Sequence, residues 1–275
     1  MTSDTAPEVS RRRRRRRSRK RAGFGARVIG ALRFWEKEWF RRATRTRLAM
    51  TAGLLVLLGV LAWHAASLGL AHLQVLRVEN SLAHWTKQGR APSASSLQQA
   101  FAAIDRAIAL HPDNPYQLTL RARLLGWRAF ASAGEEFPRA EYEQALALYR
   151  RAAALRPLWP ESWAEMVDVK LNLGEVDGEL ERFLERADTL GPYTPAVHIA
   201  TVRAGFAQLQ RYPFQNPPLL EKHLLRGLQD PRSRRQVLGL VEQYEQQAYT
   251  CRLLARIARE EGESSVPKLS FCRKG

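Results

Sequence analysis

The sequence predicts an all-α protein, in which one N-terminal transmembrane helix precedes a solenoid of paired helices that a C-terminal helix caps. Three observations predict this fold. The stretch between Arg47 and Arg77 holds no charged residue. After it, glycine and proline fall between segments of helical periodicity. No segment of useful length shows the alternation of apolar and polar residues that is typical of a half-buried strand. Three of those segments repeat one spacing of small and apolar residues.

The predicted transmembrane helix covers residues 48–70. At about 1.5 Å per residue, Leu48–Leu68 alone is about 32 Å long, which is enough to cross a hydrocarbon core of about 30 Å. The apolar pattern continues to Trp85 and does not end in a cleavage site, so the segment indicates an uncleaved signal anchor. His64 lies inside the span, where a proton or ligand role and a plain helix contact both stay open.

Charge is concentrated before this helix. Residues 1–47 carry 17 Lys and Arg against four acids, whereas residues 48–275 carry 27 against 23. Because Lys and Arg accumulate on the cytoplasmic side, the N-terminus should stay inside and the C-terminal part should be exported. In a bacterium this predicts a single-pass inner-membrane protein with a periplasmic domain.

Two segments make up the basic region. Residues 1–23, with the run RRRRRRRSRKR, form a predicted disordered cytoplasmic tail that enforces topology and contacts anionic lipid. A nucleic-acid partner is not expected, because no recognisable nucleic-acid-binding fold accompanies the run. Residues 24–46 predict an amphipathic helix in the headgroup layer, with packing on a cytoplasmic partner as the alternative.

The predicted repeat domain covers residues 71–261. Three segments share spacings of four, three and five residues at Ala100, Ile104, Ala107 and Pro112; at Ala145, Tyr149, Ala152 and Pro157; and at Leu180, Leu184, Ala187 and Pro192. This pattern resembles the second helix of the tetratricopeptide repeat, in which small residues permit close helix approach. Trp163 falls at the tryptophan place of the first helix, and Gly174 at the turn between paired helices.

Helix ends are also predicted. Ser95 and Gln98 offer a capping box for the helix after residues 89–96. One short helix over Leu219–Gly227 and one long helix over Arg232–Arg259 should close the solenoid, because a stack of hairpins exposes its apolar flank unless it is capped.

The two cysteines lie near the end of the chain. Cys251 belongs to the predicted last helix, and Cys272 to a C-terminal tail over residues 262–275. The tail is long enough to reach back along the helix, so a disulfide is sterically possible. In an oxidising compartment it would contribute about 3 kcal/mol. Two unrelated thiols are the alternative.

Enzymatic motifs are missing from the sequence, which holds no HExxH, no GxSxG and no glycine-rich phosphate loop. We therefore expect no catalytic residue, no metal and no cofactor. Trp85, Trp127, Trp159 and Trp163 could stack on sugars, and Trp159, between two prolines, is the best surface candidate. Arg121 and Arg128 lie about two helical turns apart, so they could line a groove or simply be solvated.

Residues 150–200 resemble the VpsP-type accessory proteins of exopolysaccharide biosynthesis loci. The features that carry this resemblance are the ALRP-x-WP-x-SW turn, a helix ending in NLGE and the LGPY-x-PAV turn. The resemblance covers roughly residues 100–260 and implies a non-catalytic accessory role, with no active-site residues to assign.

Together these observations predict a membrane-anchored scaffold for exopolysaccharide biosynthesis or export, which acts by binding protein partners. Two alternatives stay open. One is a tethered repeat scaffold of another cell-envelope or secretion complex. The other is a periplasmic glycan-binding protein, which would need exposed aromatic residues in its groove.

Overall fold

The computed structural model describes residues 44–132, 137–212 and 217–273, and within these ranges every regular element is a helix. The α-helices are α2 (Arg45–Gln88), α3 (Ala94–Leu110), α4 (Pro115–Ala131), α5 (Arg139–Leu155), α6 (Pro160–Asn172), α7 (Gly178–Leu190), α8 (Pro195–Arg211), α9 (Leu220–Gln229), α10 (Arg234–Gln243) and α11 (Gln247–Glu261). Short 3₁₀ turns follow at Glu263–Ser265 and Ser270–Arg273. The predictions for residues 1–23 and 24–43 lie outside the described residues.

The chain divides into two compact units, residues 1–63 (unit 1) and residues 64–275 (unit 2). The described part of unit 1 is Thr44 and the beginning of α2. Within the described ranges, α2 is the helix that is long and apolar enough to cross a membrane. Its large apolar side chains are exposed at Leu54, Leu55, Val56, Leu57, Leu58, Val60, Leu61 and Trp63.

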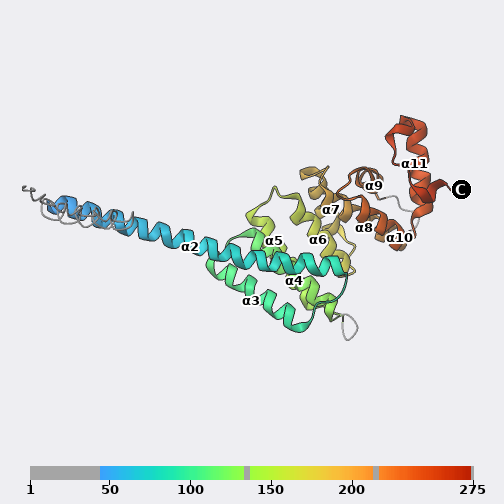
Figure 1. Ribbon diagram of the computed structural model, residues 1–275. Coiled ribbons are helices and arrows are strands. Elements are labelled where there is room, and N and C mark those ends of the chain that lie inside the picture. Colours follow the sequence, from blue (N-terminus) through green and yellow to red (C-terminus); the bar gives the residue numbers. More distant parts are fainter. Residues whose placement is uncertain (1–43, 133–136, 213–216, 274–275) are drawn as a thin grey trace, which may run out of the picture. The chain divides into compact units, whose positions relative to one another are not determined.

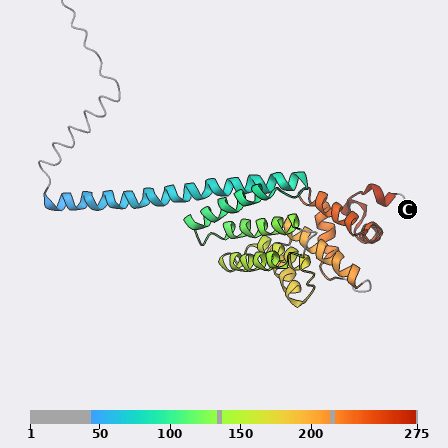
Figure 2. The same ribbon diagram turned by 90° about the horizontal axis from the view of Figure 1, so that it is seen from below.

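Unit 2 consists of helix pairs. Helix α4 packs against α5, α6 against α7, and α8 against α9, while α5 and α8 both contact α6 (Figure 1). Figure 2 shows α4 and α5 side by side from another direction. Proline at the first helical turn begins α4, α6 and α8, where its fixed φ suits a helix and its missing N–H costs nothing.

Small and apolar residues fill the space between the helices. Buried side chains include all nine non-proline positions of the predicted repeat pattern: Ala100, Ile104, Ala107, Ala145, Tyr149, Ala152, Leu180, Leu184 and Ala187. Pro112, Pro157 and Pro192 lie in the turns after α3, α5 and α7. Gly174 follows α6 with φ +73°, a conformation that favours glycine.

Helix α3 begins earlier than the sequence suggests. Its N-cap is Ser93, whose Oγ accepts the backbone N–H of Ser96, and Ser95 lies inside the helix. The predicted capping box at Ser95 and Gln98 therefore does not form. Proline at position 92 of the sequence fits this start, because a residue before the N-cap is extended.

The predicted long helix over Arg232–Arg259 is two helices, α10 and α11. Glu245 separates them with φ +55°, although neither glycine nor proline marks the break. The ring of Tyr244 packs 5.9 Å from the ring of Phe206 in α8. Tertiary packing thus accompanies a break for which the local sequence gives no signal.

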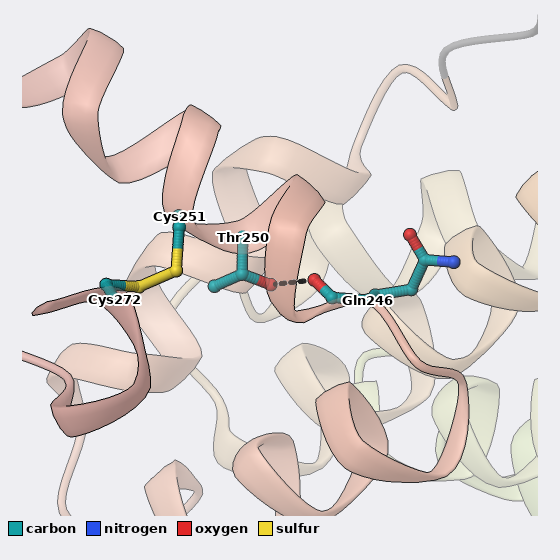
Figure 3. Close-up of a disulfide and its surroundings, with 4 residues drawn as sticks. All are labelled: Gln246, Thr250, Cys251 and Cys272. Carbon is teal, nitrogen blue, oxygen red and sulfur yellow. Dashed lines mark hydrogen bonds between the residues drawn. A yellow bond between two sulfur atoms is a disulfide. The ribbon is translucent and has the colours of Figure 1, made fainter. Parts of the chain in front are cut away.

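A disulfide joins the C-terminal tail to α11. Cys251 and Cys272 are bonded, with their Cα atoms 5.4 Å apart (Figure 3). Next to Cys251, the Thr250 hydroxyl donates to the backbone oxygen of Gln246 at 2.8 Å, within the first turn of α11. Leu269 and Phe271 of the tail pack on the same core as α8, α9 and α11, so the bridge closes over a hydrophobic cluster.

Candidate functional site: a groove in unit 2

A groove of about 1110 Å³ runs across unit 2. Helices α2 and α4 line most of it, and α5, α6, α8 and α10 contribute one residue each. Its lining includes Glu79, Leu82, Lys87, Tyr116, Arg123, Trp127, Phe130, Tyr142, Asn172, Arg203 and Gln236. The groove therefore depends on how neighbouring helix pairs stack.

Polar contacts connect α2 to α4 and α4 to α6 along the groove. The Tyr116 hydroxyl of α4 donates to Glu79 of α2. The Arg123 guanidinium of α4 donates to Glu165 of α6 through Nε at 2.9 Å and through a second nitrogen. Charge-assisted bonds of this kind fix geometry more firmly than neutral ones.

The next contact connects α8 back to α6. Arg203 donates to Oδ1 of Asp168 at 3.0 Å and to Oδ1 of Asn172 at 2.6 Å. We call this series of interhelical contacts the groove ladder; its members are Glu79, Tyr116, Arg123, Glu165, Asp168, Asn172 and Arg203. The ladder holds four alternate helices in a fixed register.

Burial and charge both act on the ladder's pKa values. Burial raises the pKa of Glu165 and of Asp168, and the arginine beside each opposes this rise. Burial, and then the Glu79 carboxylate, raise the pKa of Tyr116 to about 12. Tyr116 therefore stays a neutral hydrogen-bond donor throughout the neutral pH range.

Aromatic rings form one wall of the groove. The ring of Trp127 meets Trp85 edge-on at 5.8 Å and Phe130 edge-on at 5.7 Å. Trp85 is buried, whereas Phe130 is 51% exposed. Lys87, in the last turn of α2, has no ion-pair partner in the described part of the chain. The groove thus offers an apolar ring surface, a free cation and fixed polar groups.

The two predicted groove arginines lie elsewhere. Arg121 donates to Asp105 of α3 at 2.9 Å. Arg128 lies over the ring of Phe101 at 5.0 Å and 3.5 Å from Glu141. Neither belongs to the groove lining, which Arg123 joins in their place. Because successive residues turn by about 100° around a helix, Arg123 points about 200° away from Arg121.

The two tryptophans at the start of α6, its N-cap residue Trp159 and Trp163 in the helix, have different surroundings. Trp163 is partly buried, packs against Phe183 of α7, and donates its indole N–H to the Pro157 oxygen at 3.2 Å. Trp159 is 50% exposed, lies outside the groove lining, and carries the Arg156 guanidinium 5.5 Å from its ring.

Sequence reasoning missed a buried histidine pair between α8 and α9. Nδ1 of His198 lies 2.8 Å from Nδ1 of His223, and Nε2 of His223 lies 3.0 Å from Asp188. Lys222 donates to the same carboxylate at 2.6 Å. Burial, reinforced by the charge of His223, lowers the pKa of His198 to about 4. Burial also lowers the pKa of His223.

The turn between α6 and α7 is closed by a buried lysine. Nζ of Lys170 donates to Glu175 at 2.7 Å, Asp177 at 2.7 Å and Glu179 at 3.1 Å. Lys170 is itself buried, and the three acidic partners raise its pKa despite that burial. Asp177 also caps α7 by accepting two backbone N–H groups. The carboxylates here serve the fold.

No group of three or more metal-ligating side chains gathers anywhere in the described ranges. No protein-family model matches the chain, and no curated protein matches it significantly. The function is therefore inferred from the geometry of the groove and from the sequence patterns.

Proposed function

We propose that the protein is a membrane-anchored helical-repeat scaffold, whose groove holds a protein partner of an exopolysaccharide biosynthesis or export machine. The observation that best supports this proposal is the groove itself, which the groove ladder holds open between alternate helices. Scaffolds of this kind bind a peptide, a helix or a neighbouring subunit. In this proposal the chain is not an enzyme and uses no cofactor.

The packing of unit 2 supports a tetratricopeptide-like solenoid. Consecutive pairs α4/α5, α6/α7 and α8/α9 contact their neighbours, and the first helices of adjacent pairs, α6 and α8, also touch. In a solenoid each repeat contacts only the next one, and the terminal helices cover the last apolar face. Helices α10 and α11 take that capping role here.

The exposed apolar part of α2 supports the membrane anchor. An apolar surface of this size on a helix is unfavourable in water, so lipid is its natural environment. The Lys and Arg asymmetry then favours a cytoplasmic N-terminus and a periplasmic unit 2. The disulfide fits an oxidising compartment. A phosphatase fused after Gly275 should be active only in this orientation.

The polysaccharide pathway depends on the resemblance of residues 150–200 to the VpsP-type proteins. A scaffold of another cell-envelope or secretion complex would have the same anchor and the same groove, and would differ in its partner. Identifying the binding partner therefore distinguishes the two scaffolds.

Photo-crosslinking from the groove in intact cells tests the proposal. A benzophenone amino acid at Phe130 probes the groove wall, and the same amino acid at Phe137, which is exposed but outside the groove lining, is the matched control. We expect adducts with polysaccharide assembly or export proteins from Phe130 only. Equal adducts from both positions, or none from either, would remove the groove from the proposal. Adducts with secretion proteins would favour the alternative scaffold.

One observation favours a second candidate, a glycan-binding groove. Trp127 and Phe130 form an aromatic wall beside the fixed polar groups of Arg123 and Asn172, and sugars bind through stacking plus hydrogen bonds. Calorimetry of the purified chain with oligosaccharides separates the two functions. Binding that Phe130→Ala weakens would favour the glycan, and no binding favours the protein partner.

A further inference from the structure

A second surface of unit 2 lies at the turns after α5 and α7. Its tips are Leu158, Trp159 and Tyr193, which are 72%, 50% and 69% exposed. The two turns touch, because a Cβ added to Gly191 would lie 2.6 Å from Cβ of Pro160. We call this surface the rim; it consists of Leu158, Trp159, Tyr193, Arg156, Arg186 and Arg226.

Each rim arginine lies over an aromatic ring. The guanidinium carbon of Arg156 is 5.5 Å from the Trp159 ring centre, that of Arg186 is 5.9 Å from Trp163, and that of Arg226 is 4.3 Å from Tyr193. Arg226 also donates to the Pro192 oxygen at 2.8 Å, which fixes it against the turn. Ring stacking thus positions all three cations, and the bond to Pro192 also fixes Arg226.

None of these three arginines has a carboxylate partner among the described residues, in contrast to Arg123, Arg150, Arg151 and Arg203. The acid nearest in sequence to Trp159 is Glu161, in the first turn of α6. The rim therefore combines cations without carboxylate partners, amphipathic rings and an aliphatic tip. This combination suits a surface that is anionic at its boundary and apolar beneath it.

We propose that the rim is a peripheral membrane-contact site, which binds anionic phospholipid headgroups. Guanidinium groups bind phosphate oxygens, Trp and Tyr favour the headgroup level, and Leu158 would enter the boundary with the acyl chains. The turn after α3 lies beside the end of α5 at which the rim begins, because Asp113 of that turn pairs with Arg151 of α5 at 3.1 Å. An acidic glycan would engage the arginines but leave the exposed Leu158 without a role.

The contact needs little intrinsic affinity, because a tether holds the domain at high local concentration near the bilayer. This inference rests on the membrane anchor of the proposed function, and it is independent of the partner in the groove. Lysine or arginine near an anionic surface contributes roughly fivefold per residue to binding. Three rim arginines therefore amount to about a hundredfold preference for anionic lipid.

A fluorescence experiment on the full chain tests the rim. The environment-sensitive NBD group is attached at Leu158→Cys, with Phe137→Cys as the exposed control in the turn before α5 and Leu57→Cys as a reporter of α2 insertion. Each labelled chain is placed in phosphatidylglycerol-rich or phosphatidylcholine-only nanodiscs. We expect the probe at 158 to shift to the blue and resist iodide quenching in the phosphatidylglycerol discs only, while the probe at 137 stays water-exposed in both.

The arginines provide the second comparison. The triple variant R156Q/R186Q/R226Q should return the probe at 158 to water, whereas Glu161→Gln should increase its protection. A probe at 158 as exposed as that at 137, equal protection in both lipids, or protection by alginate in detergent but not by anionic discs would overturn the proposal. If the probe at 57 is protected and that at 158 is not, only the rim fails; if 57 is also exposed, the membrane anchor fails first.

Discussion

Arginine has two different environments in unit 2, and the difference distinguishes arginines that stabilise the fold from arginines that are available at the surface. In the groove ladder, Arg123 and Arg203 bind carboxylates of the neighbouring helix pair. At the rim, Arg156 and Arg186 lie over aromatic rings and have no carboxylate partner among the described residues. The groove arginines therefore hold helices together, and the rim arginines keep their charge available to another molecule.

The largest expected effect comes from breaking the groove ladder. Arg123→Met leaves the Glu165 carboxylate, whose side chain is 16% exposed, without its cation. Removing the cation beside this mostly buried carboxylate leaves an uncompensated charge, and we expect a loss of about 2–4 kcal/mol in the free energy of unfolding. Urea unfolding of the full chain in detergent measures it. The matched rim variant Arg156→Met should change stability by less than about 0.5 kcal/mol.

A second substitution checks the cause of that loss. In R123M/E165Q the stranded charge is gone, so the double variant should be more stable than Arg123→Met alone. If the double variant is as unstable as the sum of the single ones, the loss arises from packing of the arginine stem and not from its charge. Equal losses from Arg123→Met and Arg156→Met would abolish the contrast between groove and rim.

Acid should weaken the interior of unit 2 at the buried histidine pair. Because the pKa of folded His198 is about 4 and its ordinary value is 6.5, the neutral form is favoured by folding. The resulting stability is fully present above pH 6.5 and is lost as the pH falls toward 4. The shift corresponds to up to about 3 kcal/mol.

The measurement compares unfolding free energies of the wild type and His198→Asn from pH 7 to pH 4. The comparison with the variant is needed because other groups also change the pH dependence of the wild type. Burial raises the pKa of Glu165 and Asp168, and carboxyl groups with raised pKa values increase stability as the pH falls. The wild type should lose more than the variant, and the exposed control His84→Asn should follow the wild type. Parallel curves for wild type and His198→Asn would mean that the buried pair is not the acid-sensitive element.

Local signals explain which parts of the fold the sequence could predict. Pro112, Pro157 and Pro192 mark turns after helices because proline cannot continue a helix, and the apolar spacing before them lies on one buried face. By contrast, the break at Glu245 has no breaker residue, and its positive φ accompanies the packing of Tyr244 on Phe206. A single-sequence pattern does not contain that contact.

The groove ladder shows the same limit, although a signal for it exists. Arg123 and Glu165 are 42 residues apart, and Asp168 and Arg203 are 35 apart, close to the 45- and 35-residue spacings of the repeat prolines. Opposite charges one repeat apart on equivalent helices would have indicated these pairs. The histidine pair is harder, because its 25-residue separation follows no repeat and its contact depends on how α9 meets α8.

The smallest expected effect distinguishes the two tryptophans at the start of α6, Trp159 and Trp163. Trp159→Ala removes a ring that is 50% exposed and lies beside the Arg156 guanidinium, so the free energy of unfolding should change by less than about 0.5 kcal/mol. Trp163→Ala removes a ring that packs on Phe183 and donates to the Pro157 oxygen, and should cost several times more. Thermal unfolding in detergent compares them. If Trp159→Ala lowers the free energy of unfolding as much as Trp163→Ala does, the exposed ring stabilises the turn. The rim could then not be treated as a surface that is free to bind lipid.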